Sequence, residues 1–262
     1  VMERLGLDFE TISARNEQIV YACVRGFGDP RPGESPYAHW PSLDAAAQSF
    51  GGLVFAIDGL VTPAIADIFP GTLAALGLVS AIHESKTSGK GQFLDVSMYD
   101  AMLAFQKSAV AQYSFTGKPN PSGLQRAMTL YPFDLFPAKD GQVSIAVGQP
   151  HHWDLLCAAM ERGDMINDDR SATNNARLKN VEWVEEQICA WTSQLTRAEI
   201  MAKLDGSLPA GPVQNMSDIF QDEHVTARSM LDTWSPGGEN PDMSLAAKPI
   251  SCSRAKADLY QS

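Results

Sequence analysis

Residues 66–98 read ADIFPGTLAALGLVSAIHESKTSGKGQFLDVSM, and one carboxylate, Asp67, stands at the start of this largely apolar, helix-like stretch. A polar turn at 86–92 leads from the helix pattern into a strand-like run at 93–98. Spacing alone leaves two interpretations of Asp67 open. It is either an N-cap that accepts backbone N–H bonds, or a reacting carboxylate oriented by the positive end of the helix. Gly71, with no side chain, leaves more room beside the carboxylate than capping requires.

The flanking sequence predicts an α/β fold. Residues 18–24 form a nearly continuous apolar and β-branched run, which suits a strand buried on both faces. A proline-rich loop follows at 29–41, and Ser42 is a candidate N-cap for the next helix. After the strand at 93–98, a helix is expected over 100–113. Buried strands that alternate with helices are typical of a Rossmann-like α/β domain.

The second half of the chain has a different texture. Two short strands are expected at 129–138 and 142–147, joined by the hairpin signal Lys139-Asp140-Gly141. Helices are then expected at 152–160, at 175–195, and from the capping box that Thr196 and Glu199 form. This pattern indicates a smaller α+β unit.

We therefore expect four segments. Residues 1–116 are part of a large Rossmann-like domain that carries Asp67, and 117–123 is a linker rich in Pro, Gly, Asn and Ser. Residues 124–230 form the small α+β domain. Residues 231–262 lead back toward the large domain.

Composition excludes some classes of partner. The chain has 262 residues, is 44% hydrophobic and carries a formal net charge of −11. An acidic protein lacks the clustered Lys and Arg with which nucleic-acid binders neutralise phosphates, so no nucleic-acid partner is expected. No membrane is expected either, because the apolar run around 71–82 is too short to span one.

The cysteines carry no metal signature. Cys23, Cys157, Cys189 and Cys252 are far apart, with no CxxC or Cys/His ligand spacing. We expect no metal site, free thiols and a cytoplasmic location with a reducing environment.

The ordered motifs bring a family into view. Asp67 with Gly71, and the turn leading into Asp95-Val96-Ser97-Met98, closely resemble the class III CoA-transferases, which include formyl-CoA transferase and carnitine CoA-transferase (the CaiB/BaiF proteins). Further matches follow in the family's order: Gly26-Phe27-Gly28, Pro36-Tyr37-Ala38-His39, Lys139-Asp140-Gly141, Asp169-Arg170 and Pro209-Ala210-Gly211-Pro212-Val213. The resemblance covers almost the whole chain.

This resemblance implies a covalent mechanism for transfer of CoA to a carboxylic acid. Asp67 would attack an acyl-CoA thioester to give a mixed anhydride and CoA thiolate, and the thiolate would return to form an aspartyl-CoA thioester. The implied partners are acyl-CoA and a small carboxylic acid, with CoA as substrate and no tightly bound cofactor. An interlocked homodimer is also implied.

The resemblance assigns further candidate residues. Pro41, Ser42 and Leu43 are candidate CoA contacts because they directly precede Asp44. Arg126 lies where the family has a glycine-rich active-site loop, and its position and charge suggest a hypothesis in which it pairs with the acceptor carboxylate.

Two alternatives remain open. The first is an acyl-CoA racemase or isomerase of the same superfamily. By our alignment, those enzymes have a His where this chain has Leu43, and His39 is expected to be an ordinary loop residue, so both count against it. The second is a chain without the family's N-terminal segment and C-terminal end, serving in assembly or binding without turnover.

Overall fold

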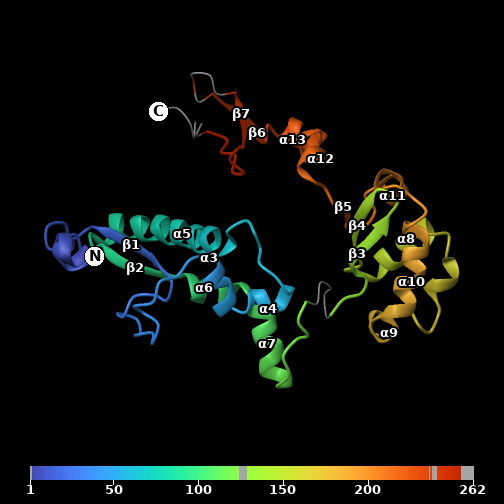
Figure 1. The fold of residues 1–262 in the computed structure, drawn as a ribbon, viewed down its shortest axis with the longest axis horizontal. Helices are drawn as coiled ribbons and strands as arrows, with labels where there is room; N and C mark the ends of the chain where they lie inside the picture. Colours follow the sequence, from blue (N-terminus) through green and yellow to red (C-terminus); the bar gives the residue numbers. More distant parts are fainter. Residues whose placement is uncertain (1, 124–128, 236, 238–240, 255–262) are drawn as a thin grey trace. The chain divides into compact units, whose positions relative to one another are not determined.

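The computed structural model describes residues 2–123, 129–235, 237 and 241–254. They form two compact units, Val1–Gln125 and Arg126–Ser262, which are coloured from blue to red along the chain (Figure 1). The boundary lies just after the predicted linker 117–123. Ser122 and Gly123 of that segment both donate to the Phe55 carbonyl of the first unit.

The first unit is built around one β-α-β crossover. Its two strands, β1 (Val20–Arg25) and β2 (Gln92–Ser97), are parallel, with Val20 opposite Gln92 and Arg25 opposite Ser97. The helices are α1 (Met2–Leu5), α2 (Phe9–Ser13), α3 (Asp44–Phe50), α4 (Leu53–Ile57), α5 (Ile65–Ser88), α6 (Met98–Phe105) and α7 (Lys107–Thr116). The predicted α/β class is confirmed.

Helix α5 extends past the strands at one end. Near its C-terminus, Ser85 Oγ donates to the Gln18 carbonyl, just before β1 begins. In its middle, a Cβ on Gly77 would lie 2.9 Å from Leu94 Cδ2, so only a small residue permits this approach to β2. Asp67 is ten residues earlier, about 15 Å further along the helix axis. It therefore lies beyond the carboxyl ends of the strands, where open α/β sheets bind their ligands.

A small core holds this end of α5. Ala66 of α5 is fully buried with Ala47 of α3, Leu53 of α4, and Met98 and Met102 of α6. These contacts join four helices around the turn that carries Asp67, so the position of that turn depends on the packing of this core.

The length argument against a membrane span was wrong. The apolar run belongs to a helix of 24 residues, and by length and composition α5 could cross a membrane, with only 22% of its most apolar window buried. One such helix is weak evidence, because long helices in globular proteins share this composition. The contacts of α5 with β1 and β2 show instead a crossover helix with one uncovered face.

The second unit contains a three-stranded antiparallel sheet in the order β3 (Phe133–Ala138), β4 (Gly141–Ala146), β5 (Ala210–Pro212). Its helices are α8 (Pro150–Ala159), the 3₁₀ helix η1 (Gly163–Ile166), α9 (Asn174–Lys179), α10 (Val181–Thr192), α11 (Arg197–Leu204), α12 (Met216–Phe220) and α13 (Glu223–Ala227). Strands β6 (Leu231–Trp234) and β7 (Met243–Ala246) form a separate hairpin. The α+β class and the predicted β3–β4 hairpin are confirmed, and Gly141 has a φ of +149°.

Candidate active site at the start of helix α5

The N-terminus of α5 is capped from another helix. Asp44, the first residue of α3, accepts a hydrogen bond from the Ala66 backbone N–H through Oδ1 at 2.8 Å. Its other oxygen, Oδ2, accepts from the Gln48 side-chain amide at 2.7 Å. One carboxylate thus connects α3 to the residue immediately before Asp67.

The side chain of Gln48 completes this connection. It is fully buried, and it both accepts from the Val61 N–H (3.0 Å) and donates to the Val61 carbonyl (2.9 Å). The buried amide is therefore fully bonded, as buried polar groups must be to avoid a desolvation cost. Asp44 and Gln48, four residues apart on one face of α3, hold both the approach to α5 and its first turn.

Asp67 is not the N-cap of its helix. The cap position is Ala64, and Asp67 lies inside the first turn, with its own N–H bonded to the Ala64 carbonyl at 3.0 Å. The Asp67 side chain is exposed and has no hydrogen bond or ion pair within the part of the chain that the structure describes. Of the two interpretations offered by spacing, capping is therefore wrong, because Asp44 already fills that role.

The residues after Asp67 differ from the expected helix start. Because α5 begins at Ile65, Pro70 lies in the helix interior and is buried. A proline there supplies no N–H to the carbonyl four residues earlier, so a regular helical bond is missing at Ala66. Gly71 is exposed, and a Cβ added to it would meet nothing within 4 Å. No contact in this unit requires a glycine there, and the space beside Asp67 on the next helical turn is open.

The three predicted CoA contacts lie at the same end of the sheet. Ser42 packs against Gly26, the residue after β1, where a Cβ would come within 2.2 Å of Ser42 Cβ. Its Oγ is buried and has no hydrogen-bond partner among the described residues. Pro41 is exposed, and Leu43 is 79% exposed. The predicted cap at Ser42 is wrong, because the N-cap of α3 is Leu43, which makes no side-chain cap bond.

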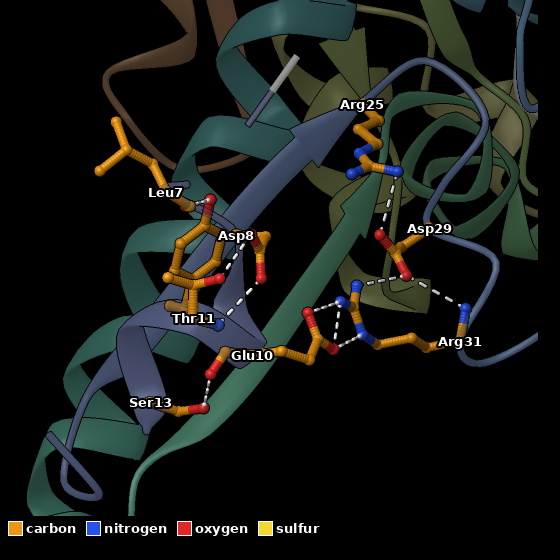
Figure 2. A network of polar contacts seen from close by, with 9 residues as sticks. Leu7, Asp8, Glu10, Thr11, Ser13, Arg25, Asp29 and Arg31 are labelled. Atoms are coloured by element: carbon orange, nitrogen blue, oxygen red, sulfur yellow. Dashed lines mark hydrogen bonds and ion pairs between the residues drawn. The ribbon is translucent and has the colours of Figure 1, made fainter. Parts of the chain in front are cut away.

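A charged network fixes the loop after β1 (Figure 2). Asp29 is only 3% exposed and pairs with Arg25 at 3.0 Å and with Arg31 at 2.7 Å. Arg31 also pairs with Glu10 of α2 at 2.6 Å and lies over the Phe93 ring. Its hydrogen bond to Glu10 raises the pKa of Arg31 and lowers that of Glu10.

The β2 strand joins this loop through Asp95. Asp95 Oδ2 accepts from the Asp29 backbone N–H at 2.9 Å, while Asp95 Oδ1 is buried with no bond partner in the described chain. Gly28, between them, has a φ of +82°. The loop that follows β1 is therefore held against the carboxyl end of β2, next to Ser97.

Other candidates stand apart. Arg126 lies outside the described residues. His39 is exposed in the loop before α3, as expected for a loop residue. Among the described residues, no group of three or more His, Cys, Asp or Glu side chains is placed to hold a metal ion. The sequence reasoning identified Asp67 but missed the clamp made by Asp44 and Gln48. The four-residue spacing of these two polar side chains on one helix face was the available signal.

Comparison with known proteins agrees with this geometry. A succinyl-CoA:mesaconate CoA-transferase from Haloarcula hispanica is 37% identical over 95% of this chain and 64% of the relative. An acetyl-CoA:oxalate CoA-transferase from Acetobacter aceti is 29% identical over 88% of this chain and 60% of the relative. The chain thus spans less than two thirds of the length of these curated relatives.

Solved structures share the fold. The crystal structure of a CaiB/BaiF family protein from Brucella suis matches with a TM-score of 0.76 and 28% identity, covering 97% of this chain and 66% of that one. A structure from M. tuberculosis matches with a TM-score of 0.79 at 20% identity, which supports the fold alone. The model of CoA-transferase family III matches residues 1–262, and the chain belongs to that family.

Proposed function

We propose that this chain carries the nucleophile of a CoA-transferase, and that the nucleophile is Asp67. The observation that carries the proposal is an exposed carboxylate with no bonded partner in the first turn of a helix that Asp44 already caps. A carboxylate that caps a helix is engaged by the backbone, whereas this one is available to attack. The first turn also provides the positive end of the helix dipole, which favours the ionised form of the carboxylate.

The proposed reaction proceeds by exchange of acyl groups. An Asp67 oxygen attacks the thioester carbonyl carbon, the C–S bond breaks, and CoA leaves as a thiolate. The thiolate then attacks the Asp67 carbonyl of the mixed anhydride, which releases the first carboxylate and forms an aspartyl thioester. An incoming carboxylate displaces the thiolate again, and the thiolate attacks the new acyl group. The products are a new acyl-CoA and the original Asp67 carboxylate, so electrons and protons balance at every step.

For the substrates, the names of the relatives support a small class. Relatives of this chain are a succinyl-CoA:mesaconate and a succinate–glutarate CoA-transferase. We propose succinyl-CoA as donor and a short dicarboxylic acid as acceptor. Pro41, Ser42 and Leu43 remain the proposed CoA contacts, Arg126 the proposed contact of the acceptor carboxylate, and a homodimer the proposed assembly.

The test is direct detection of the covalent intermediate. The chain is mixed with succinyl-CoA, quenched, digested and analysed by mass spectrometry. We expect a mass increase on the peptide that contains Asp67, and none in an Asp67→Asn variant. Glu84→Gln is the matched control, because Glu84 is an exposed carboxylate on the same helix. An adduct that persists in Asp67→Asn, or transfer of CoA at the wild-type rate by that variant, would contradict the assignment.

A further inference from the structure

The second unit contains a cavity of about 260 Å³ beside a buried arginine. Arg177 of α9 lines it, together with Gly148, Gln149 and Pro150 at the start of α8. Leu130 and Val147 add an apolar part to the wall. This cavity lies in the unit that does not contain Asp67, and nothing assigned so far uses it.

Arg177 is a buried cation without a carboxylate partner. Its residue is 3% exposed; Nε donates to the Tyr131 carbonyl and Nη1 to the Ser171 carbonyl, each at 2.7 Å. Its guanidinium lies over the Trp153 ring at 4.7 Å. Two carbonyls and an aromatic face do not neutralise a buried charge, and burial lowers the pKa of Arg177.

One end of this guanidinium remains available. Nη2 makes no hydrogen bond or ion pair with any residue that the structure describes, although Nε and Nη1 both do. Because Arg177 lines the cavity, an anion there would receive the two N–H donors of Nη2. It would also supply the missing counter-charge, which makes a buried arginine favourable.

The start of α8 adds a second positive element. This helix has ten residues, and its N-cap residue Gln149 makes no side-chain cap bond. Uncapped N–H groups at a helix start, with the helix dipole behind them, favour an anion. The Gln149 side chain is exposed and unbonded in the described structure, so it too can donate to a ligand.

We infer that this cavity is a binding site for a small organic carboxylate. The buried guanidinium and the helix start would bind the carboxylate group, and Leu130 and Val147 would contact its carbon chain. The apolar wall favours such a ligand over inorganic phosphate, which presents only oxygen atoms. The inference is independent of the role proposed for Asp67, since it rests on residues of the second unit alone.

Calorimetric titration of the full chain with succinate tests the inference. We expect saturable binding to the wild type, and at least roughly tenfold weaker binding in Gly148→Asp, because the introduced carboxylate would compete for Arg177. A Cβ at Gly148 meets nothing within 4 Å, so this variant should fold. Gly163→Asp is the matched control, since Gly163 is equally unobstructed but does not line the cavity. Arg177→Met should also lose binding, but its lost backbone bonds make it the less secure variant.

Two further arms separate the outcomes. Asp67→Asn should bind succinate like the wild type, whatever its effect on CoA transfer, which keeps this site distinct from the proposed nucleophile. Inorganic phosphate should bind more weakly than succinate. The inference is overturned if succinate does not bind, if Gly148→Asp binds it as the wild type does, if binding is lost only in Asp67→Asn, or if phosphate binds more tightly.

Discussion

At the scale of single residues, Asp44 sets the environment of Asp67. Its two oxygens bond the Ala66 N–H and the Gln48 amide, and Gln48 in turn bonds Val61. Asp67 therefore stays free of backbone bonds because another carboxylate caps the helix. The sequence predicted which residue was available to react, but not why, since the cap comes from a position 22 residues earlier.

Replacing Asp44 tests this division of roles. We expect Asp44→Ala to lower the free energy of unfolding by about 0.5–2 kcal/mol, the usual cost of losing a helix cap. It should also slow formation of the Asp67 adduct, because the first turn of α5 loses its tether. Chemical denaturation and the rate of adduct formation measure the two effects. Glu84→Ala on the same helix should change neither, and an Asp44→Ala protein as stable as the wild type would refute the capping role.

The cysteines give a second prediction at this scale. Burial raises the pKa of Cys157 to about 12, whereas Cys252 is exposed. Only a thiolate is an effective nucleophile, so Cys157 should be inert at neutral pH while the protein is folded. Mass spectrometry after brief iodoacetamide treatment should find Cys252 alkylated and Cys157 unmodified. Unfolding in denaturant should expose both, and rapid native alkylation of Cys157 would show that its environment is open.

At the scale of elements, strands were easier to predict than helix ends. The runs at 18–24 and 93–98 lie within two residues of β1 and β2. The helix expected over 100–113 is divided at Gln106, whose Nε2 bonds the distant Gly51 carbonyl. The helix expected over 175–195 is divided at Asn180, whose Nδ2 bonds the Ala176 and Arg170 carbonyls. Periodicity does not reveal such side-chain bonds, because they depend on the folded chain.

The attachment of α2 to the loop after β1 should depend on pH. Arg31 lowers the pKa of Glu10 below its ordinary value of 4.5. The folded state therefore binds fewer protons here than the unfolded state, and the stabilising contribution, present above pH 4.5, is lost as pH falls through the lowered folded value. Melting temperatures measured from neutral to acidic pH should fall less steeply in Glu10→Gln than in the wild type. Glu3→Gln is the control, and an identical slope in Glu10→Gln would contradict the coupling.

At the scale of the whole molecule, the exposed side of α5 is the feature that the chain leaves unexplained by its own packing. Ile68, Leu76 and Val79 are 59%, 66% and 68% exposed. Contiguous apolar surface of this kind marks contact sites more often than free surface. The two-stranded sheet beneath is small for a parallel sheet, which is normally covered on both faces. A second copy of the chain, as in the proposed homodimer, is the partner we favour for this face.

Self-association is therefore expected, and it should respond to charge on this face. Light scattering coupled to size-exclusion chromatography should give a mass above that of one 28.4 kDa chain for the wild type. Val79→Lys, or Leu76→Lys with it, should shift the mass toward the monomer, because burying an unpaired ammonium in an apolar contact is costly. Thr87→Lys, exposed near the end of the same helix, controls for added charge alone. A monomeric wild type, or a Val79→Lys protein that associates unchanged, would show that this face does not join two copies, and the partner of α5 would then have to be another molecule.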